Sequence, residues 1–87
     1  MAEFTRQEFI KMINGHHPET QLYLALCDLS GLNLERVNLK GANLYKANLY
    51  KANLFQSNLG GAILTGANLE GANLRGANLT GVKGYNP

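Results

Sequence analysis

The chain has 87 residues, of which 45% are hydrophobic and 16% charged, and its formal net charge is +2 at pH 7. This length allows a single domain, and so small a net charge argues against a polyanionic partner such as nucleic acid. The one cysteine, Cys27, cannot form a disulfide within the chain and fits a reducing compartment, so we expect a cytoplasmic protein. We see no signal peptide and no stretch long enough to span a bilayer, so no membrane association is expected.

The non-repetitive N-terminal segment carries a helix signature. Thr5 and Glu8 match a capping box, and Phe4 and Phe9 occupy the hydrophobic-staple positions around it. An Asn-Gly pair then signals the end of the helix, so the pattern predicts a helix over roughly residues 6–13. A helix this short is not stable alone, and we expect it to pack as a cap on the segment that follows.

The remainder of the chain follows a five-residue repeat. Leucine recurs at every fifth position without a miss, at Leu29, Leu34, Leu39, Leu44, Leu49, Leu54, Leu59, Leu64, Leu69, Leu74 and Leu79. The residue two before each leucine becomes small, the residue just before it is mostly asparagine, and the residue two after it is often glycine. Neither an α-helix nor a flat strand has this period, so we infer a chain that turns at every unit.

Each position of the repeat has a physical explanation. The leucine and the small residue lie two positions apart, so both should point into one narrow interior. A recurring glycine indicates a backbone position with positive φ, as in a type II turn. If four units close one coil, residues one coil apart stack at the inter-strand spacing of about 4.8 Å. Asparagines stacked in this way can form side-chain amide ladders.

The run of Ala-Asn-Leu units from Gly41 to Leu54 resembles the pentapeptide-repeat family. The resemblance implies an all-β solenoid, a right-handed four-sided (quadrilateral) β-helix, with the leucine and the small residue inside. At four units per coil we expect about three coils. The chain then divides into an N-terminal helical cap (1–21), the β-helix (22–81) and a C-terminal tail (82–87). The family is abundant in cyanobacteria, which suggests a cyanobacterial source for the chain.

A leucine-rich-repeat horseshoe is the alternative fold. The strict five-residue period and the lack of a long convex segment disfavour it. Four residues are large for the small inner position: Leu22, Cys27, Leu32 and Val37. We expect them to form a wider core layer beneath the cap helix. One further departure is Ile63, which stands where the repeat has asparagine.

Groups suited to catalysis or metal binding are scarce. His16 and His17 are adjacent in a loop, where their side chains diverge, and only Glu19 lies near them as a further ligand. Cys27 falls at an inward position and is interpreted as a buried small hydrophobe, not a nucleophile. We therefore expect no catalytic, cofactor or metal site, no small-molecule ligand and no enzymatic activity.

The outward residues carry the candidate partner-binding site. Tyr45, Tyr50 and Phe55 are three successive outward aromatics, interleaved with Lys46 and Lys51. On a four-sided coil they form a belt around the shaft and not one flat patch. Exposed aromatic residues are enriched at protein interfaces, so these five residues are the candidates. The alternative is that the rings lie against neighbouring corners and shield the backbone.

The leading functional hypothesis is a non-enzymatic structural or protein-interaction module with an unknown partner. The family resemblance also implies a different role, since some members bind a DNA topoisomerase by imitating duplex DNA. That role needs a long acidic rod, whereas the repeats contain only Asp28, Glu35 and Glu70 as acids. A third hypothesis is that the chain is one domain of a larger protein. No polar cap follows Gly81, so we expect the last coil either to pair with a second copy as a homodimer or to continue in a longer protein.

Overall fold

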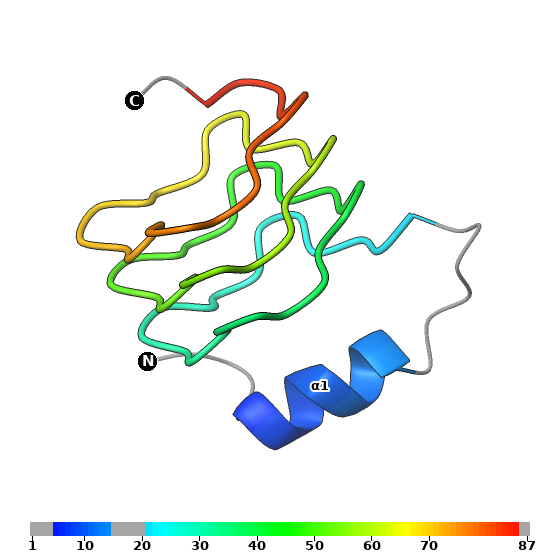
Figure 1. The fold of residues 1–87 in the computed structure, drawn as a ribbon, viewed down its shortest axis with the longest axis vertical. Coiled ribbons are helices and arrows are strands. Elements are labelled where there is room, and N and C mark those ends of the chain that lie inside the picture. Colours follow the sequence, from blue (N-terminus) through cyan, green and yellow to red (C-terminus); the bar gives the residue numbers. More distant parts are fainter. Residues whose placement is uncertain (1–4, 15–20, 86–87) are drawn as a thin grey trace.

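The computed structural model describes residues 5–14 and 21–85, which form one helix and a stack of four-sided coils (Figure 1). The helix, α1, spans Arg6–Asn14. Within the described residues, each side of a coil contributes a single paired residue flanked by turns, so no longer strand forms. We refer to residues 22–41 as the N-terminal layer, 42–61 as the middle layer and 62–81 as the C-terminal layer.

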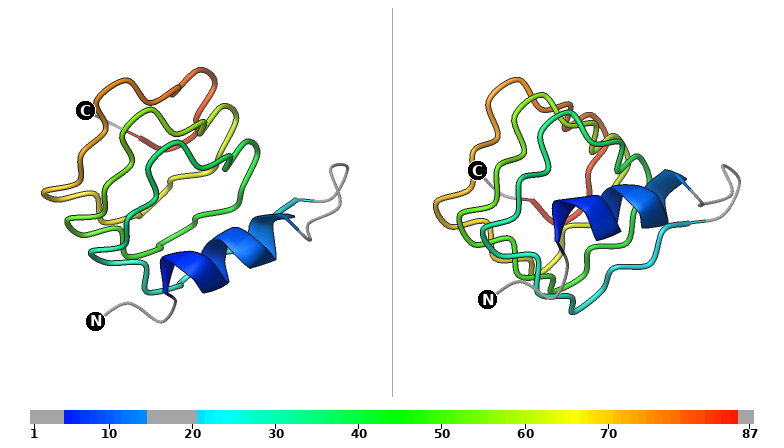
Figure 2. Two further views of the ribbon diagram at one scale, coloured as in Figure 1. Left: turned by 60° about the horizontal axis from the view of Figure 1, so that its bottom comes forward. Right: turned by 90° about the horizontal axis from the view of Figure 1, so that it is seen from below.

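Reciprocal capping bonds begin α1 as the sequence predicts. The Thr5 Oγ1 accepts from the Glu8 N–H at 3.1 Å, and the Glu8 carboxylate accepts from the Thr5 N–H at 3.0 Å. The helix ends at Asn14, one residue beyond its predicted end. Phe9 is fully buried and belongs to the same apolar cluster as the coil leucines, whereas its staple partner Phe4 lies outside the described residues. Figure 2 shows α1 lying against the N-terminal layer.

A β-turn closes each five-residue unit. The C=O of each central leucine accepts from the N–H three residues later, at 2.9 to 3.3 Å. The third residue of every turn has a positive φ, between 55° and 73°, as a type II turn requires. Glycine occupies this position at the seven sites that the sequence predicts. Five turns use other residues instead, which are Leu26, Arg36, Lys46, Lys51 and Gln56.

Residues twenty apart pair in parallel, so each layer rests directly on the one before it. The pairing defines four faces, each named here by its column of outward residues. The first face carries Tyr23, Asn43, Ile63 and Lys83; the second Asp28, Asn48 and Asn68; the third Asn33, Asn53 and Asn73; and the fourth Asn38, Asn58 and Asn78. Backbone bonds of 2.7 to 3.0 Å join the layers along every face. This register is the one that four units per coil predict.

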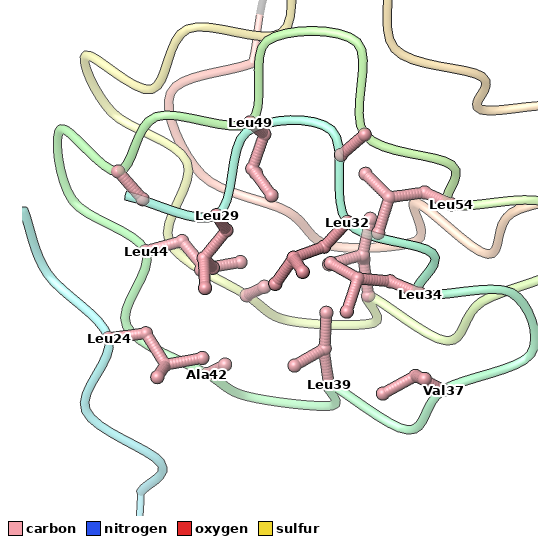
Figure 3. Packing of buried hydrophobic residues seen from close by; sticks show 14 of the residues in the cluster. Leu24, Leu29, Leu32, Leu34, Val37, Leu39, Ala42, Leu44, Leu49 and Leu54 are labelled. Carbon is pink, nitrogen blue, oxygen red and sulfur yellow. The ribbon is translucent and has the colours of Figure 1, made fainter. Parts of the chain in front are cut away.

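The interior is filled by the residues that the repeat assigns to it (Figure 3). The central leucines of the repeat units in the N-terminal and middle layers are almost completely inaccessible, as is Leu64. The large inner residues Leu22, Leu32 and Val37 are buried in the same cluster as Phe9, as expected. Cys27, however, is only partly buried where it packs against this cluster, so the expectation of a buried thiol is wrong.

The C-terminal layer is less enclosed than the other two. Its leucines Leu69, Leu74 and Leu79 are only partly buried, although they occupy the same inward position as the covered leucines beneath them. Val82 and Tyr85 of the tail pack against the core cluster but leave these side chains partly exposed. The end of the stack therefore presents apolar surface.

One inward side chain is polar, and its replacement tests the packing. The Ser57 hydroxyl is buried without a hydrogen-bond partner among the described residues. Alanine occupies the corresponding place at Ala52 and Ala62. We predict that Ser57→Ala raises the free energy of unfolding by about 1 kcal/mol, because an unpaired buried hydroxyl is removed. Urea denaturation measures this change. The matched control Ala52→Ser should lower the free energy by a similar amount, and a loss of stability in Ser57→Ala would contradict the argument.

Candidate interaction surfaces

The asparagine of the repeat is used mainly to shape the turn. At nine units its Oδ1 accepts from the backbone N–H two residues later, at 3.0 to 3.1 Å. This arrangement is an Asx-turn, which fixes the entry to the β-turn. The sequence predicted amide ladders for these asparagines but not the Asx-turns, although asparagine just before a turn is a recognised signal for this geometry.

Amide ladders also form, but only in some columns of the described residues. The Asn78 side-chain amide donates to Asn58 Oδ1 at 3.2 Å, and Asn73 donates to Asn53 at 3.4 Å. On the second face, Asn48 donates to the Asp28 carboxylate at 3.4 Å. These bonds tie adjacent layers together by their outward side chains. The outward polar atoms are thus engaged in structure.

The carboxylate of Asp28 is held in the same way. It accepts from the Ser30 hydroxyl at 2.7 Å and from the Ser30 N–H at 3.1 Å. These two bonds lower the pKa of Asp28 below its ordinary value, because they favour the charged form. A lowered pKa in the folded state means that the bonds stabilise the fold at neutral pH and that this contribution is lost as the pH falls through the lowered pKa.

The predicted aromatic belt lies at three successive corners of the middle layer. Tyr45 is 40% exposed and Tyr50 is 37% exposed, whereas Phe55 is partly buried. The Lys46 ammonium lies 5.3 Å from the centre of the Tyr45 ring, and Lys51 stands at the same distance from Tyr50. Each tyrosine is therefore paired with the lysine that follows it, by a cation–π contact.

Phe55 is in a different environment from the two tyrosines. The Arg36 guanidinium lies 5.6 Å from its ring centre, and the same guanidinium Nε donates to Gln56 Oε1 at 3.0 Å. A further Arg36 nitrogen lies 3.8 Å from the Glu35 carboxylate. An arginine of the N-terminal layer, itself held by Gln56 and close to Glu35, therefore lies over this ring. Of the five candidate residues, Tyr45, Lys46, Tyr50 and Lys51 face solvent most openly.

The lysine stems lie against glycines of the layer above. A Cβ built on Gly66 would stand 2.8 Å from Lys46 Cγ, and one on Gly71 would stand 3.0 Å from Lys51 Cγ. These distances are shorter than normal carbon contacts. The glycines thus serve two purposes, since they adopt a positive φ and leave room for the stems.

Metal ligands are not grouped in the part of the chain that the structure describes, where no three His, Cys, Asp or Glu side chains come together. The pair His16 and His17, with Glu19, lies outside the described residues. Among residues 5–14 and 21–85, no helix combines the length and apolar character that a membrane span requires.

This geometry defines a β-helical repeat protein, and comparison with known sequences gives the family. The chain matches the pentapeptide repeats, in 8 copies, over residues 23–61 and 52–83. It belongs to the pentapeptide-repeat family, whose members fold as right-handed quadrilateral β-helices. The resemblance drawn from the sequence is confirmed. Among curated protein sequences, no significant match to the chain was found.

Solved structures of cyanobacterial proteins are similar to the chain. A pentapeptide repeat protein from Cyanothece 51142 is 48% identical, with a TM-score of 0.67, over 70% of this chain and 42% of that protein. HetL, a pentapeptide repeat protein involved in heterocyst differentiation regulation in Nostoc sp. strain PCC 7120, is 29% identical, with a TM-score of 0.53, over 75% of this chain and 39% of HetL. The chain spans less than half the length of these two proteins.

The contact between Lys46 and Gly66 can be tested by a double-mutant cycle. Gly61→Ala should cost about 1 kcal/mol of unfolding free energy, because φ is positive there, while its Cβ meets no atom within 4 Å. Gly66→Ala should cost more, because the Cβ also collides with the Lys46 stem. Adding Lys46→Ala should reduce the cost of Gly66→Ala to that of Gly61→Ala. Equal costs for the two single glycine variants in urea denaturation would contradict the contact.

Proposed function

We propose that this pentapeptide-repeat module is a non-enzymatic protein-interaction module, in which a rigid β-helix presents outward side chains to a partner protein. One observation carries the proposal. Tyr45 and Tyr50 are exposed at adjacent corners of the best-enclosed layer, each with its own lysine. Aromatic side chains on a rigid support lose little conformational freedom on binding, which suits them to interfaces.

The distribution of polar groups supports a role other than catalysis. The repeat asparagines accept bonds from turn N–H groups, and the Asp28 carboxylate accepts from Ser30. Groups engaged in this way are not positioned to transfer protons or attack a substrate. We also propose a cytoplasmic location, in keeping with a sequence that contains one cysteine, Cys27, and so forms no internal disulfide.

The relatives give a limited guide to the kind of role. HetL is involved in the regulation of heterocyst differentiation, and a regulatory role is consistent with a module that acts by binding. A DNA-mimicking role is less well supported, because the middle layer presents Lys46 and Lys51 outward. A surface that imitates duplex DNA would need acidic groups in such places.

We further propose that three layers closed by α1 make one unit, and that the unit pairs with a second copy at its other end. Phe9 fills the N-terminal end, whereas Leu69, Leu74 and Leu79 are partly exposed at the C-terminal end. The backbone N–H and C=O groups of that layer that point away from the middle layer lie at a sheet edge. Two copies related by a two-fold axis can satisfy each other there.

The interaction module is tested by photo-crosslinking in the cells that naturally produce the chain. A photoreactive phenylalanine analogue at position 45 or 50 should give discrete protein adducts that excess unlabelled chain suppresses. The same analogue at position 11, an exposed position of α1 at the opposite end from the proposed pairing surface, is the control and should give far less. Absence of adducts from the tyrosine positions, or equal adducts from position 11, would contradict the proposal.

Self-association is tested separately by light scattering over a range of concentrations. We predict the mass of a dimer, with the monomer appearing on dilution. Leu74→Lys places a charge at the exposed end and should weaken dimerisation at least ~10-fold, since an apolar contact is lost and like charges meet across the axis. Lys51→Glu, on the side of the shaft, should leave the mass unchanged. A monomer at every concentration would contradict pairing.

A further inference from the structure

The first face differs from the other three in its outward residues. The second, third and fourth faces carry only asparagine or aspartate in their paired columns. The first face carries Tyr23, Asn43, Ile63 and Lys83 in that order. Tyr23 and Ile63 stand where the repeat elsewhere forms an Asx-turn, and neither side chain can make that bond. The departures from the repeat are thus gathered on one side of the shaft.

These departures lie on the same side of the shaft as two apolar corner residues, with Asn43 between Tyr23 and Ile63. Tyr23 and Ile63 pair with Asn43 from opposite sides, so they occupy alternate layers of one column. Beside this column, the Leu26 N–H donates to the Tyr45 C=O at 2.9 Å, so Leu26 lies in register with Lys46 of the next layer and diagonal to Tyr45. We name Tyr23, Leu26, Tyr45 and Ile63 the first-face strip. Its members come from all three layers.

The strip is unusually open for an apolar surface. Tyr23 is 70% exposed and Leu26 is 71% exposed, the highest values among the large hydrophobic side chains described. Ile63 is half-buried and does not belong to the interior cluster. Leu26 also occupies a turn position with a φ of 65°, where glycine would be free of strain.

Among the described residues, the charges at the corners before and after the first face and at the end of its column are positive. Lys46 flanks it at the first corner, and Lys83 ends its column. Lys40 lies at the fourth corner, which leads into the first face. Of the acidic residues of the repeats, Asp28 lies on the second face, two residues after Leu26, and Glu70 and Glu35 lie at the corners that follow the second and third faces, respectively. A complementary partner is therefore negatively charged as well as apolar.

The fourth corner also leaves room beside the first face. Gly41, Gly61 and Gly81 stack there with φ values of 70° to 73°. A Cβ on Gly41 or Gly61 would meet no atom within 4 Å, although the Gln21 side-chain amide donates to the Gly41 C=O at 3.1 Å. A partner chain can approach the backbone closely along this edge.

We propose that the first-face strip docks an acidic, apolar segment of a partner protein. The proposal rests on the interaction function proposed above and identifies the surface and the chemistry of its partner. A protein segment fits better than a lipid surface, because three lysines and a short apolar strip are too few for stable membrane attachment. Nucleic acid fits less well still, because the lysines do not follow a line of phosphates.

The test is a selection from a displayed library of random sixteen-residue peptides, with the folded chain as bait. Recovered peptides should be enriched in Asp and Glu together with Leu, Phe or Trp. Their affinity should fall at least ~10-fold for the variant Tyr23→Asn/Leu26→Gly/Ile63→Asn, which restores the repeat residues on this face. Lys46→Glu should weaken binding further and make it less dependent on salt. Circular dichroism checks that each variant is folded.

Tyr50→Ala, at the neighbouring corner, is the matched control and should bind the selected peptides as the unaltered chain does. The proposal is overturned if no peptide is recovered, if the peptides lack acidic residues, or if they bind the triple variant with equal affinity. It is also overturned if the triple variant still binds the peptides but no longer binds anionic vesicles of phosphatidylserine and phosphatidylcholine. Crosslinks from position 50 together with any of these results would leave the interaction module standing and remove only this surface.

Discussion

A turn that closes every five residues is the constraint on which the rest of the structure depends. Each turn needs its third residue in the left-handed region, and twelve hydrogen-bonded turns follow one another with this conformation. Because every turn bends the chain in the same sense, four units close a coil and residues twenty apart come into register. Burial of the leucines follows from that register, as does the backbone bonding between layers. Even Lys46 and Lys51 accept this conformation, which shows that stacking outweighs the local cost.

The same constraint separates the residues that build the protein from those that can act. Inward positions are restricted to leucine and small residues, and the outward asparagines are engaged in Asx-turns. What remains variable is the corner residues and the few outward positions that depart from asparagine. Any specific recognition by this module must therefore come from such residues, among which the aromatic and cationic ones are prominent. The two proposed surfaces, at the middle-layer corners and along the first face, are both of this kind.

Much of the fold could be predicted from the sequence, because its information is periodic. The five-residue spacing fixed the inward leucines, and the Thr5 and Glu8 pair located the start of α1. The surface was harder to predict. Tyr45, Tyr50 and Phe55 are recognisable because they are close in sequence, but they lie on different corners. The placement of Tyr23, Leu26 and Ile63 on one side depends on the pairing of residues one coil apart, and it emerges only once the register is known.

The account rests most directly on that register, and nuclear Overhauser contacts between backbone protons in solution measure it. We predict cross-peaks between Tyr23 and Asn43 and between Asn43 and Ile63, with matching contacts on the other three faces. Such contacts would place the first-face strip on one side of the shaft. Cross-peaks displaced by one five-residue unit would contradict the four-sided coil, and with it both proposed surfaces.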